Sequence, residues 1–230
     1  MNHIQPFNVA ELPNSSFNIY VGKRRTGKST LVEHQIRQMM AAKMLDIAFL
    51  FSPTDAGFPM IPKEYRYDTV DELPTIVQNM KLINEYNKVA PKRDKIKARV
   101  LIVLDDNAIH LKSKGLNILE ELSTCGRHHA YEPCSLHFCI LSQSLTKIPR
   151  VCRLNCDCIF MAQQSSRVEL DQILNENFFV LDGSREGMRE GRALFNELII
   201  SEPFLFVVVE NFRQNVKAYG DYIKKYIAEI

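Results

Sequence analysis

The sequence predicts an α/β fold, in which a mainly parallel central sheet is flanked by helices. Short apolar runs of strand length alternate along the chain with amphipathic stretches of helix length. Two of these runs, VLIVL and FCIL, are apolar at every position, which is typical of strands covered on both faces. A glycine-containing loop, GKRRTGKST, joins the first strand to the first helix. Together these features favour parallel strands linked by helical crossovers.

The expected elements follow from these patterns in chain order. Strands are expected at residues 17–21, 46–52, 99–106, 135–143, 157–162 and 204–210. Helices are expected near 28–44, 71–90, 114–125, 166–176, 186–196 and 214–228. Residues 53–70 contain three prolines and little periodicity, which indicates a long irregular connection.

Length and composition favour one domain spanning residues 1–230. With 46% hydrophobic residues the chain can bury one substantial core, and no low-complexity tract or linker divides it. A net charge of +2 predicts no strongly basic coat, so any contact with a polyanion must come from local patches. The start of the chain lacks the pattern of a signal peptide, and no run is long enough to span a bilayer. The six cysteines are interpreted as reduced thiols of a protein that is not secreted.

The loop GKRRTGKST matches the complete phosphate-binding pattern GxxxxGK(S/T). Gly22 and Gly27 let backbone N–H groups turn inward, Lys28 can reach the β- and γ-phosphates, and Ser29 can ligate Mg²⁺. The residues expected to bind the nucleotide are Gly22, Arg25, Thr26, Gly27, Lys28, Ser29 and Thr30. A strand precedes the loop and a helix follows it, as in P-loop NTPases. Lys23, Arg24 and Arg25 occupy variable positions and are expected to point largely outward.

Two further strand ends carry polar side chains. The apolar strand VLIVLDD ends in Asp105 and Asp106, which is what a Walker B strand looks like. Asp105 is expected to hold Mg²⁺, and Asp106 to orient or deprotonate the attacking water. Gln143 ends another buried strand, and in a parallel sheet the carboxyl ends of neighbouring strands open on one crevice. Gln143 is therefore the candidate sensor of the γ-phosphate.

Arginines without obvious acidic partners in the sequence form the last candidate group: Arg127, Arg150 and Arg153. Charge that develops on a transferring phosphoryl group is stabilised by a guanidinium, which a neighbouring subunit often supplies. Arg127 follows a helix in the stretch GRHH, where it could cross an interface. The sequence does not choose among the three.

In their order and spacing, GKRRTGKST, VLIVLDD, GRHH, FCILSQS and IPRVCRLNCD resemble the genome-packaging ATPases of large DNA viruses. These form the poxvirus-type branch of the FtsK/HerA superfamily, which also occurs in virophages and related transposons. The resemblance covers about residues 15–165 and thins after them, so residues 166–230 could form a lid or a docking element. It departs from the superfamily at Asp106, where Glu is typical, although the viral branch often has two Asp residues.

The resemblance implies a RecA/FtsK-like fold and an ATPase that uses ATP and Mg²⁺. It implies catalytic roles for Asp106 and Gln143, and action in trans by Arg127 or Arg153. It also implies a homo-oligomeric ring, pentameric or hexameric, that pumps double-stranded DNA into a preformed capsid, in the virion or the host-cell cytoplasm. Grip on the DNA backbone requires cations, and one candidate set is Lys92, Arg93, Lys95, Lys97 and Arg99, although an ordinary solvated loop is the commoner meaning of such a run.

Two other function classes remain open. A nucleotide or small-molecule kinase has a similar size and phosphate loop, but it would not explain LSQS after a strand that ends in two Asp residues. A non-motor ATP-binding switch would bind nucleotide without appreciable turnover. A GTPase version of that switch would also need a late NKxD motif, which the chain lacks.

Overall fold

The computed structural model describes residues 4–54, 57–106, 114–128, 130, 132–164, 166–177 and 184–228. Its strands are β1 (Phe17–Val21), β2 (Ile47–Phe51), β3 (Arg66–Tyr67), β4 (Arg99–Asp105), β5 (Ser135–Ser142), β6 (Cys158–Met161), β7 (Phe206–Glu210) and β8 (Ile223–Tyr226). Its helices are α1 (Lys28–Ala41), α2 (Leu73–Val89), α3 (Lys114–Cys125), α4 (Arg150–Asn155), α5 (Arg167–Asn177), α6 (Arg185–Ser201) and α7 (Tyr219–Tyr222). No described helix has the length and apolar character needed to cross a membrane.

All eight of these strands join one sheet, in the order β3-β2-β4-β5-β1-β6-β7-β8. The pairs from β3 to β6 are parallel, and β7 pairs antiparallel with both β6 and β8. This confirms the predicted α/β class with a mainly parallel sheet. The strand β5 lies between β1 and β4, so the ends of the three strands expected to carry the functional residues are neighbours.

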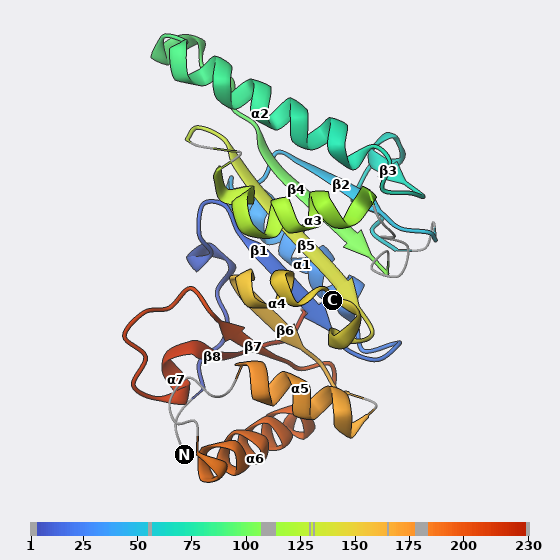
Figure 1. Cartoon of the computed structure of the whole chain (residues 1–230), viewed down its shortest axis with the longest axis vertical. Coiled ribbons are helices and arrows are strands. Elements are labelled where there is room, and N and C mark those ends of the chain that lie inside the picture. Colours follow the sequence, from blue (N-terminus) through green and yellow to red (C-terminus); the bar gives the residue numbers. More distant parts are fainter. Residues whose placement is uncertain are drawn as a thin grey trace.

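The two faces of the sheet are covered unequally. One face packs against α1 and the N-terminal segment, with Leu31, Ile36 and Phe7 among the buried residues. The other face packs against helices α2 to α6. In Figure 1, α2, α3 and α4 lie in front of the strands and α1 lies behind them. Every residue of β1, β5, β6 and β7 is buried, as their apolar runs predict.

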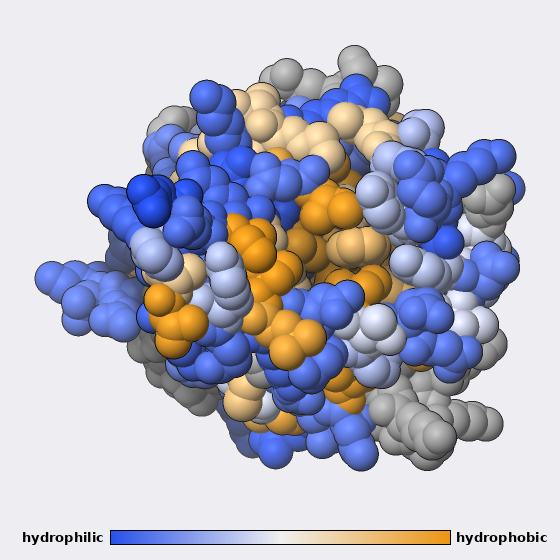
Figure 2. All heavy atoms as spheres, turned by 90° about the horizontal axis from the view of Figure 1, so that it is seen from above, coloured by the Kyte–Doolittle hydropathy of each residue, from blue (hydrophilic) through white to orange (hydrophobic). Residues whose placement is uncertain are grey.

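The edge at β2 is less completely covered. Figure 2 looks onto the end of the molecule that stands at the top of Figure 1, and it shows apolar side chains gathered in a hollow framed by polar ones. At this edge β3 pairs only with Leu50 and Phe51 of β2, and Ile47 and Phe49 remain partly exposed. The strand β3 lies within the segment 53–70, for which the sequence indicated only an irregular connection.

The predicted helix at 214–228 is wrong. The structure has the four-residue helix α7 followed by the strand β8, which pairs with β7. Apolar residues at 219, 222, 223 and 226 imitate a helical period, but the aromatic and β-branched residues among them also suit a strand. The open edge of β7 supplies hydrogen-bond partners for that strand, and this pairing decides the outcome. The strand expected at 204–210 begins two residues later, at Phe206.

Candidate functional site

The loop between β1 and α1 folds tightly around the start of the helix. Arg25 and Gly27 have positive φ angles of 63° and 86°. Gly22 lies against the end of β6, where an added Cβ would come within 2.7 Å of the Ala162 Cβ and of the Thr26 hydroxyl. No side chain fits there without displacing a neighbour. The glycines of the motif thus serve a sharp turn and a close approach.

Lys28 holds this loop closed from the inside. Its side chain is buried, and Nζ donates hydrogen bonds to the carbonyl oxygens of Gly22 at 2.7 Å and Lys23 at 3.1 Å. The Thr26 hydroxyl donates to the same Lys23 carbonyl at 2.9 Å. Burial lowers the pKa of Lys28, and the charges of Asp106 and Asp105 act in the opposite direction. The ammonium group therefore lies near both acids, in a position to bind an anionic ligand.

Asp105 ends β4 half-buried. Burial raises the pKa of its carboxyl group to about 6, the neighbouring Asp106 adds to the rise, and Lys28 opposes it. Among the described residues, none donates a hydrogen bond to this carboxylate. A partly desolvated carboxylate with free oxygens suits a hard cation such as Mg²⁺. The half-buried hydroxyl of Ser29 directly follows Lys28, whose charge acts on this carboxylate, and it offers a second oxygen ligand. The donor set fits the cofactor that the sequence predicts.

Asp106 and Gln143 contact each other directly. Gln143 Nε2 donates a hydrogen bond of 2.8 Å to Asp106 Oδ2, and the Asp106 backbone N–H donates to the Leu141 carbonyl at 3.2 Å. Asp106 has a φ of 51°, which an L-residue rarely adopts. Such backbone strain is concentrated at functional sites. The structure thus brings together two residues that lie 37 positions apart in the sequence.

A third acid, Glu169, fixes the loop that follows Gln143. Its carboxylate accepts hydrogen bonds from the Ser144 hydroxyl at 2.5 Å, the Leu145 N–H at 2.8 Å and the Thr146 hydroxyl at 2.9 Å. Burial alone would raise the pKa of Glu169, but these hydrogen bonds outweigh it and lower the pKa. Sequence reasoning missed this residue. Ser166 and Glu169 have the spacing of a helix capping box, which conceals the role in the loop.

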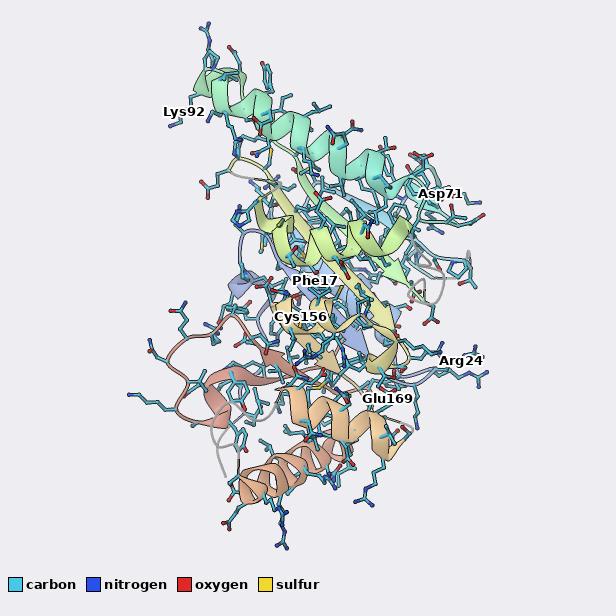
Figure 3. The ribbon with its side chains drawn as sticks, in the orientation of Figure 1. Phe17, Arg24, Asp71, Lys92, Cys156 and Glu169 are labelled. Atoms are coloured by element: carbon cyan, nitrogen blue, oxygen red, sulfur yellow. The ribbon has the colours of Figure 1, made fainter. Side chains whose placement is uncertain are left out.

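The other cations of the phosphate loop point outward. Lys23, Arg24 and Arg25 are exposed, and Figure 3 shows Arg24 extending away from the sheet. Figure 3 also labels Lys92 at the upper left, far from Arg24, in the basic stretch before β4. The two cationic groups therefore lie at opposite ends of the strands.

The candidate arginines are not gathered around the phosphate loop. Arg153 lies on α4 and pairs with Glu176 of α5 through an N···O distance of 2.8 Å, with 10% of its side chain exposed. The sequence expectation that it lacks an acidic partner is wrong, because the partner comes from another helix. Arg150 is exposed. Arg127 lies in the 3-10 turn Gly126–His128, after the end of α3 and before β5, and its side chain lies outside the described part of the chain.

Arg99, a member of the candidate DNA-contact set, pairs with an acid within the chain. Its guanidinium forms a two-pronged pair with the Asp46 carboxylate, in which Nε lies 2.8 Å from Oδ2 and Nη2 contacts Oδ1. The pair joins the start of β4 to the residue before β2. The remaining members of the basic set are Lys92, Arg93 and Lys97, which are exposed, and Lys95, which is half-buried.

Comparison with known proteins identifies the fold. No protein-family model and no curated protein sequence matches the chain. Among solved structures it is similar to the genome packaging NTPase B204 from Sulfolobus turreted icosahedral virus 2 in complex with sulfate, with a TM-score of 0.63 and 16% identity over 95% of this chain and 99% of that one. It is also similar to the pCW3 conjugation coupling protein TcpA bound to ATPγS, with a TM-score of 0.58 and 13% identity over 92% of this chain and 60% of that one.

A third neighbour is the cytoplasmic domain of the type VII secretion ATPase EccC from Thermomonospora curvata, with a TM-score of 0.55, 14% identity, and coverage of 96% of this chain and 26% of that one. These neighbours are a genome packaging NTPase, a conjugation coupling protein and a secretion ATPase, and at identities of 16% or less the likeness shows a shared fold. The likeness in fold extends over 95% of the chain for B204, beyond residues 15–165, where the sequence motifs lie.

Proposed function

We propose that the chain is an ATPase that uses ATP hydrolysis to drive double-stranded DNA into a viral capsid. The observation that carries the proposal is the hydrogen bond between Gln143 and Asp106, next to Lys28 and Asp105, at the carboxyl ends of neighbouring strands. A phosphate loop alone would only bind a nucleotide. An acid and an amide held together beside it form a site that can position a water molecule for attack.

Each residue of this site has its own proposed role in hydrolysis. Backbone N–H groups from Gly22 to Thr30 bind the phosphates, and Lys28 transfers its hydrogen bonds from the loop carbonyls to the β- and γ-phosphates. Ser29 and Asp105 would hold Mg²⁺, which would supply positive charge to stabilise the phosphate oxygens. Asp106 takes the proton of the attacking water while the bond between the γ-phosphorus and the bridging oxygen breaks, leaving ADP and inorganic phosphate. Gln143 orients Asp106 and the water.

An arginine from a neighbouring subunit would complete the site. Arg153 can act in this way only if it leaves Glu176. The backbone of Arg127 lies near the start of β5, away from the phosphate loop of its own chain, so its action would have to be in trans. We therefore rank Arg127 ahead of Arg153, in a homo-oligomeric ring of five or six subunits.

The test of a finger in trans uses mixed rings. An Arg127→Ala chain and an Asp106→Asn chain should each be inactive alone, because each lacks one half of a shared site. Mixing them should restore ATP hydrolysis at interfaces that pair an intact Asp106 with an intact Arg127. Absence of rescue for the Arg127 and Arg153 variants alike would remove both assignments, and a monomer under ATP and DNA would contradict the ring.

DNA contact is proposed for the exposed cations Lys92, Arg93 and Lys97. The measurement is the rate of ATP hydrolysis with and without double-stranded DNA at several salt concentrations. DNA should stimulate hydrolysis, the stimulation should weaken with salt, and reversing these three charges should remove it while the DNA-free rate stays unchanged. Lys217→Glu, at another exposed lysine, is the control.

The same assay separates the other function classes. Transfer of phosphate to a nucleoside in the absence of DNA would indicate a kinase, and tight binding without turnover would indicate a switch. Packaging itself requires a capsid partner, and we propose that the assembly works in the virion or in the host-cell cytoplasm where virions form.

A further inference from the structure

The connection between α6 and β7 presents an aromatic ring beside the phosphate loop. Phe204 is 60% exposed and has a φ of 58°, in the left-handed region that side chains rarely adopt. A strained backbone that exposes a large apolar ring costs stability without contributing to the core. This combination indicates that the ring is placed for a ligand or a partner.

The ring packs over the end of the phosphate loop. A Cβ built on Gly27 would lie 3.5 Å from Phe204 Cδ1 and 4.0 Å from Phe204 Cβ. Gly27 is the residue before α1, and Thr30 lies in the first turn of that helix. Phe204 therefore flanks the point where backbone N–H groups at the helix start would hold phosphate.

A groove of about 230 Å³ opens beside the ring, and it is lined mainly by apolar residues: Gly27, Thr30, Pro203, Phe204, Phe206, Ile227 and Ala228. Among the described residues of this lining, Thr30 carries the only polar side-chain group. Such a groove suits a flat apolar surface more than a charged one. The described lining thus offers almost no side-chain group that could form a hydrogen bond with the edge of a base.

The strand order gives the direction in which a bound nucleotide would run. Asp105, Asp106 and Gln143 lie at the ends of β4 and β5, on one side of β1. These side chains would contact the γ-phosphate of a bound nucleotide. The groove beside Phe204 lies toward β7 and β8, on the other side of β1. A nucleoside triphosphate that crosses the phosphate loop thus directs its nucleoside toward Phe204.

We propose that Phe204 is a stacking platform for the base of the bound nucleotide, and that the groove accepts purine bases with little selection between them. The proposal rests on the proposed ATP site and adds the part that recognises the base. Binding energy comes from the face of the ring, because aromatic stacking tolerates different bases. The strained backbone at Phe204 then has a function, since it turns the ring toward the loop.

The test compares ATP with Mg²⁺-tripolyphosphate, which has the phosphates without the base. Phe204→Ala should weaken ATP binding roughly 5- to 150-fold, the effect of losing one stacking contact, and leave tripolyphosphate binding unchanged. GTP should follow ATP within a few-fold. The control is Val89→Ala, at an apolar residue of α2 that is 83% exposed and does not line this groove; it should bind all three ligands like the native chain.

Tryptophan fluorescence gives a second readout. The chain contains no Trp, so Phe204→Trp adds a single fluorophore that keeps an aromatic ring at this position. ATP and GTP should quench its emission, and tripolyphosphate should not. Native affinity for ATP in this variant supports stacking.

Each contrary result has its own meaning. Equal weakening of ATP and tripolyphosphate by Phe204→Ala would overturn the proposal, because Phe204 would then act only by shaping the loop. Unchanged ATP binding in Phe204→Ala, with normal hydrolysis, would overturn the stacking role and leave the ATPase intact. If the native chain bound neither ATP nor tripolyphosphate, the proposed function itself would fail, and the base platform with it.

Discussion

Polar side chains at the two ends of the parallel strands differ in their hydrogen bonding. At the amino ends, polar groups bond to one another: His137 to the Ser16 hydroxyl at 2.9 Å, Asp157 to the Phe17 N–H at 2.7 Å, and Arg99 to Asp46. At the carboxyl ends, Gln143 bonds to Asp106, while the Asp105 carboxylate and the start of α1 retain capacity for further partners.

This difference separates structural from functional polar groups. The amino-end pairs join neighbouring strands and satisfy groups that burial would otherwise penalise. At the carboxyl end, Asp105 and Asp106 put like charges side by side next to Lys28, and Asp106 has a strained φ angle, which is an arrangement that folding alone does not favour. Changes at the carboxyl end should therefore alter catalysis, and changes at the amino end should alter stability.

The largest effect is expected for Asp106→Asn. The amide keeps the size of the side chain but cannot accept a proton, so the rate of ATP hydrolysis should fall by about 10²- to 10⁴-fold. ATP affinity should stay within a few-fold of native, because the phosphate loop is untouched. Single-turnover hydrolysis and equilibrium binding check both parts. A rate near that of the native chain would exclude Asp106 as the base.

A smaller effect is expected for Gly22→Ala. The new Cβ would lie 2.7 Å from the Ala162 Cβ and from the Thr26 hydroxyl, so the loop must shift. We expect a loss of about 1–3 kcal/mol in unfolding free energy and weaker ATP binding.

Ala162→Gly supplies the matched test of this close approach, because it removes one of the two clashing atoms. The double variant should recover part of the lost stability and affinity, as measured by a double-mutant cycle. Strict additivity of the two single changes would show that the contact with Ala162 does not limit the loop.

Glu169→Gln should lower the hydrolysis rate by about tenfold or less, since it weakens the charge-assisted hydrogen bonds that fix the loop after Gln143. The KM for ATP should change little. Asp171→Asn, on the same helix but paired with Arg192, is the control and should leave the DNA-free rate per assembled ring unchanged. Equal effects of both substitutions would mean that α5 acts only through its stability.

The last effect concerns the amino end of the strands, leaves the rate of ATP hydrolysis at pH 7 unchanged, and appears only in the pH dependence of stability. Burial lowers the pKa of His137 to about 4 from its ordinary 6.5. Above pH 6.5 the ring is neutral in both states, so it adds no pH dependence. As the pH falls from 6.5 to 4, His137 binds a proton in the unfolded chain but not in the folded chain. The unfolding free energy should therefore fall by up to about 3 kcal/mol.

Denaturant unfolding at pH 7 and pH 5 measures this slope, and His137→Gln should reduce it. His34→Gln, which removes a partly buried histidine from α1, should keep the contribution of His137. An equal slope in the native and His137→Gln chains would contradict the assignment. Neither substitution should affect the rate of ATP hydrolysis at pH 7 beyond its effect on the folded fraction.

Local patterns predicted the parts of the molecule that depend on local chemistry. Continuous apolar runs located β1, β4 and β5, and the spacing from Gly22 to Ser29 identified the phosphate loop. Because the carboxyl ends of parallel strands lie at the same end of a sheet, the closeness of Asp106 and Gln143 could also be predicted from the sequence. The prediction of a helix at 214–228 failed because pairing with the free edge of β7 outweighed the helix-like spacing of apolar residues, which is a tertiary effect.

Contacts between distant elements were beyond the sequence. Glu176 pairs with Arg153 across 23 residues, and Glu169 binds a loop on another element. Phe204 reaches Gly27 from the far end of the chain, and the sequence assigned it to a strand. In each case the partner is chosen by how helices and strands pack.

The central claim is that the carboxyl end of the sheet binds and hydrolyses ATP, and Lys28 tests it most directly. The measurement is the rate of Mg²⁺-dependent ATP hydrolysis by the native chain, Lys28→Ala and Lys23→Ala. The account predicts hydrolysis by the native chain, a loss of at least about 10²-fold in Lys28→Ala, and little change in Lys23→Ala, whose side chain is exposed. Equal rates in the native and Lys28→Ala chains would contradict it.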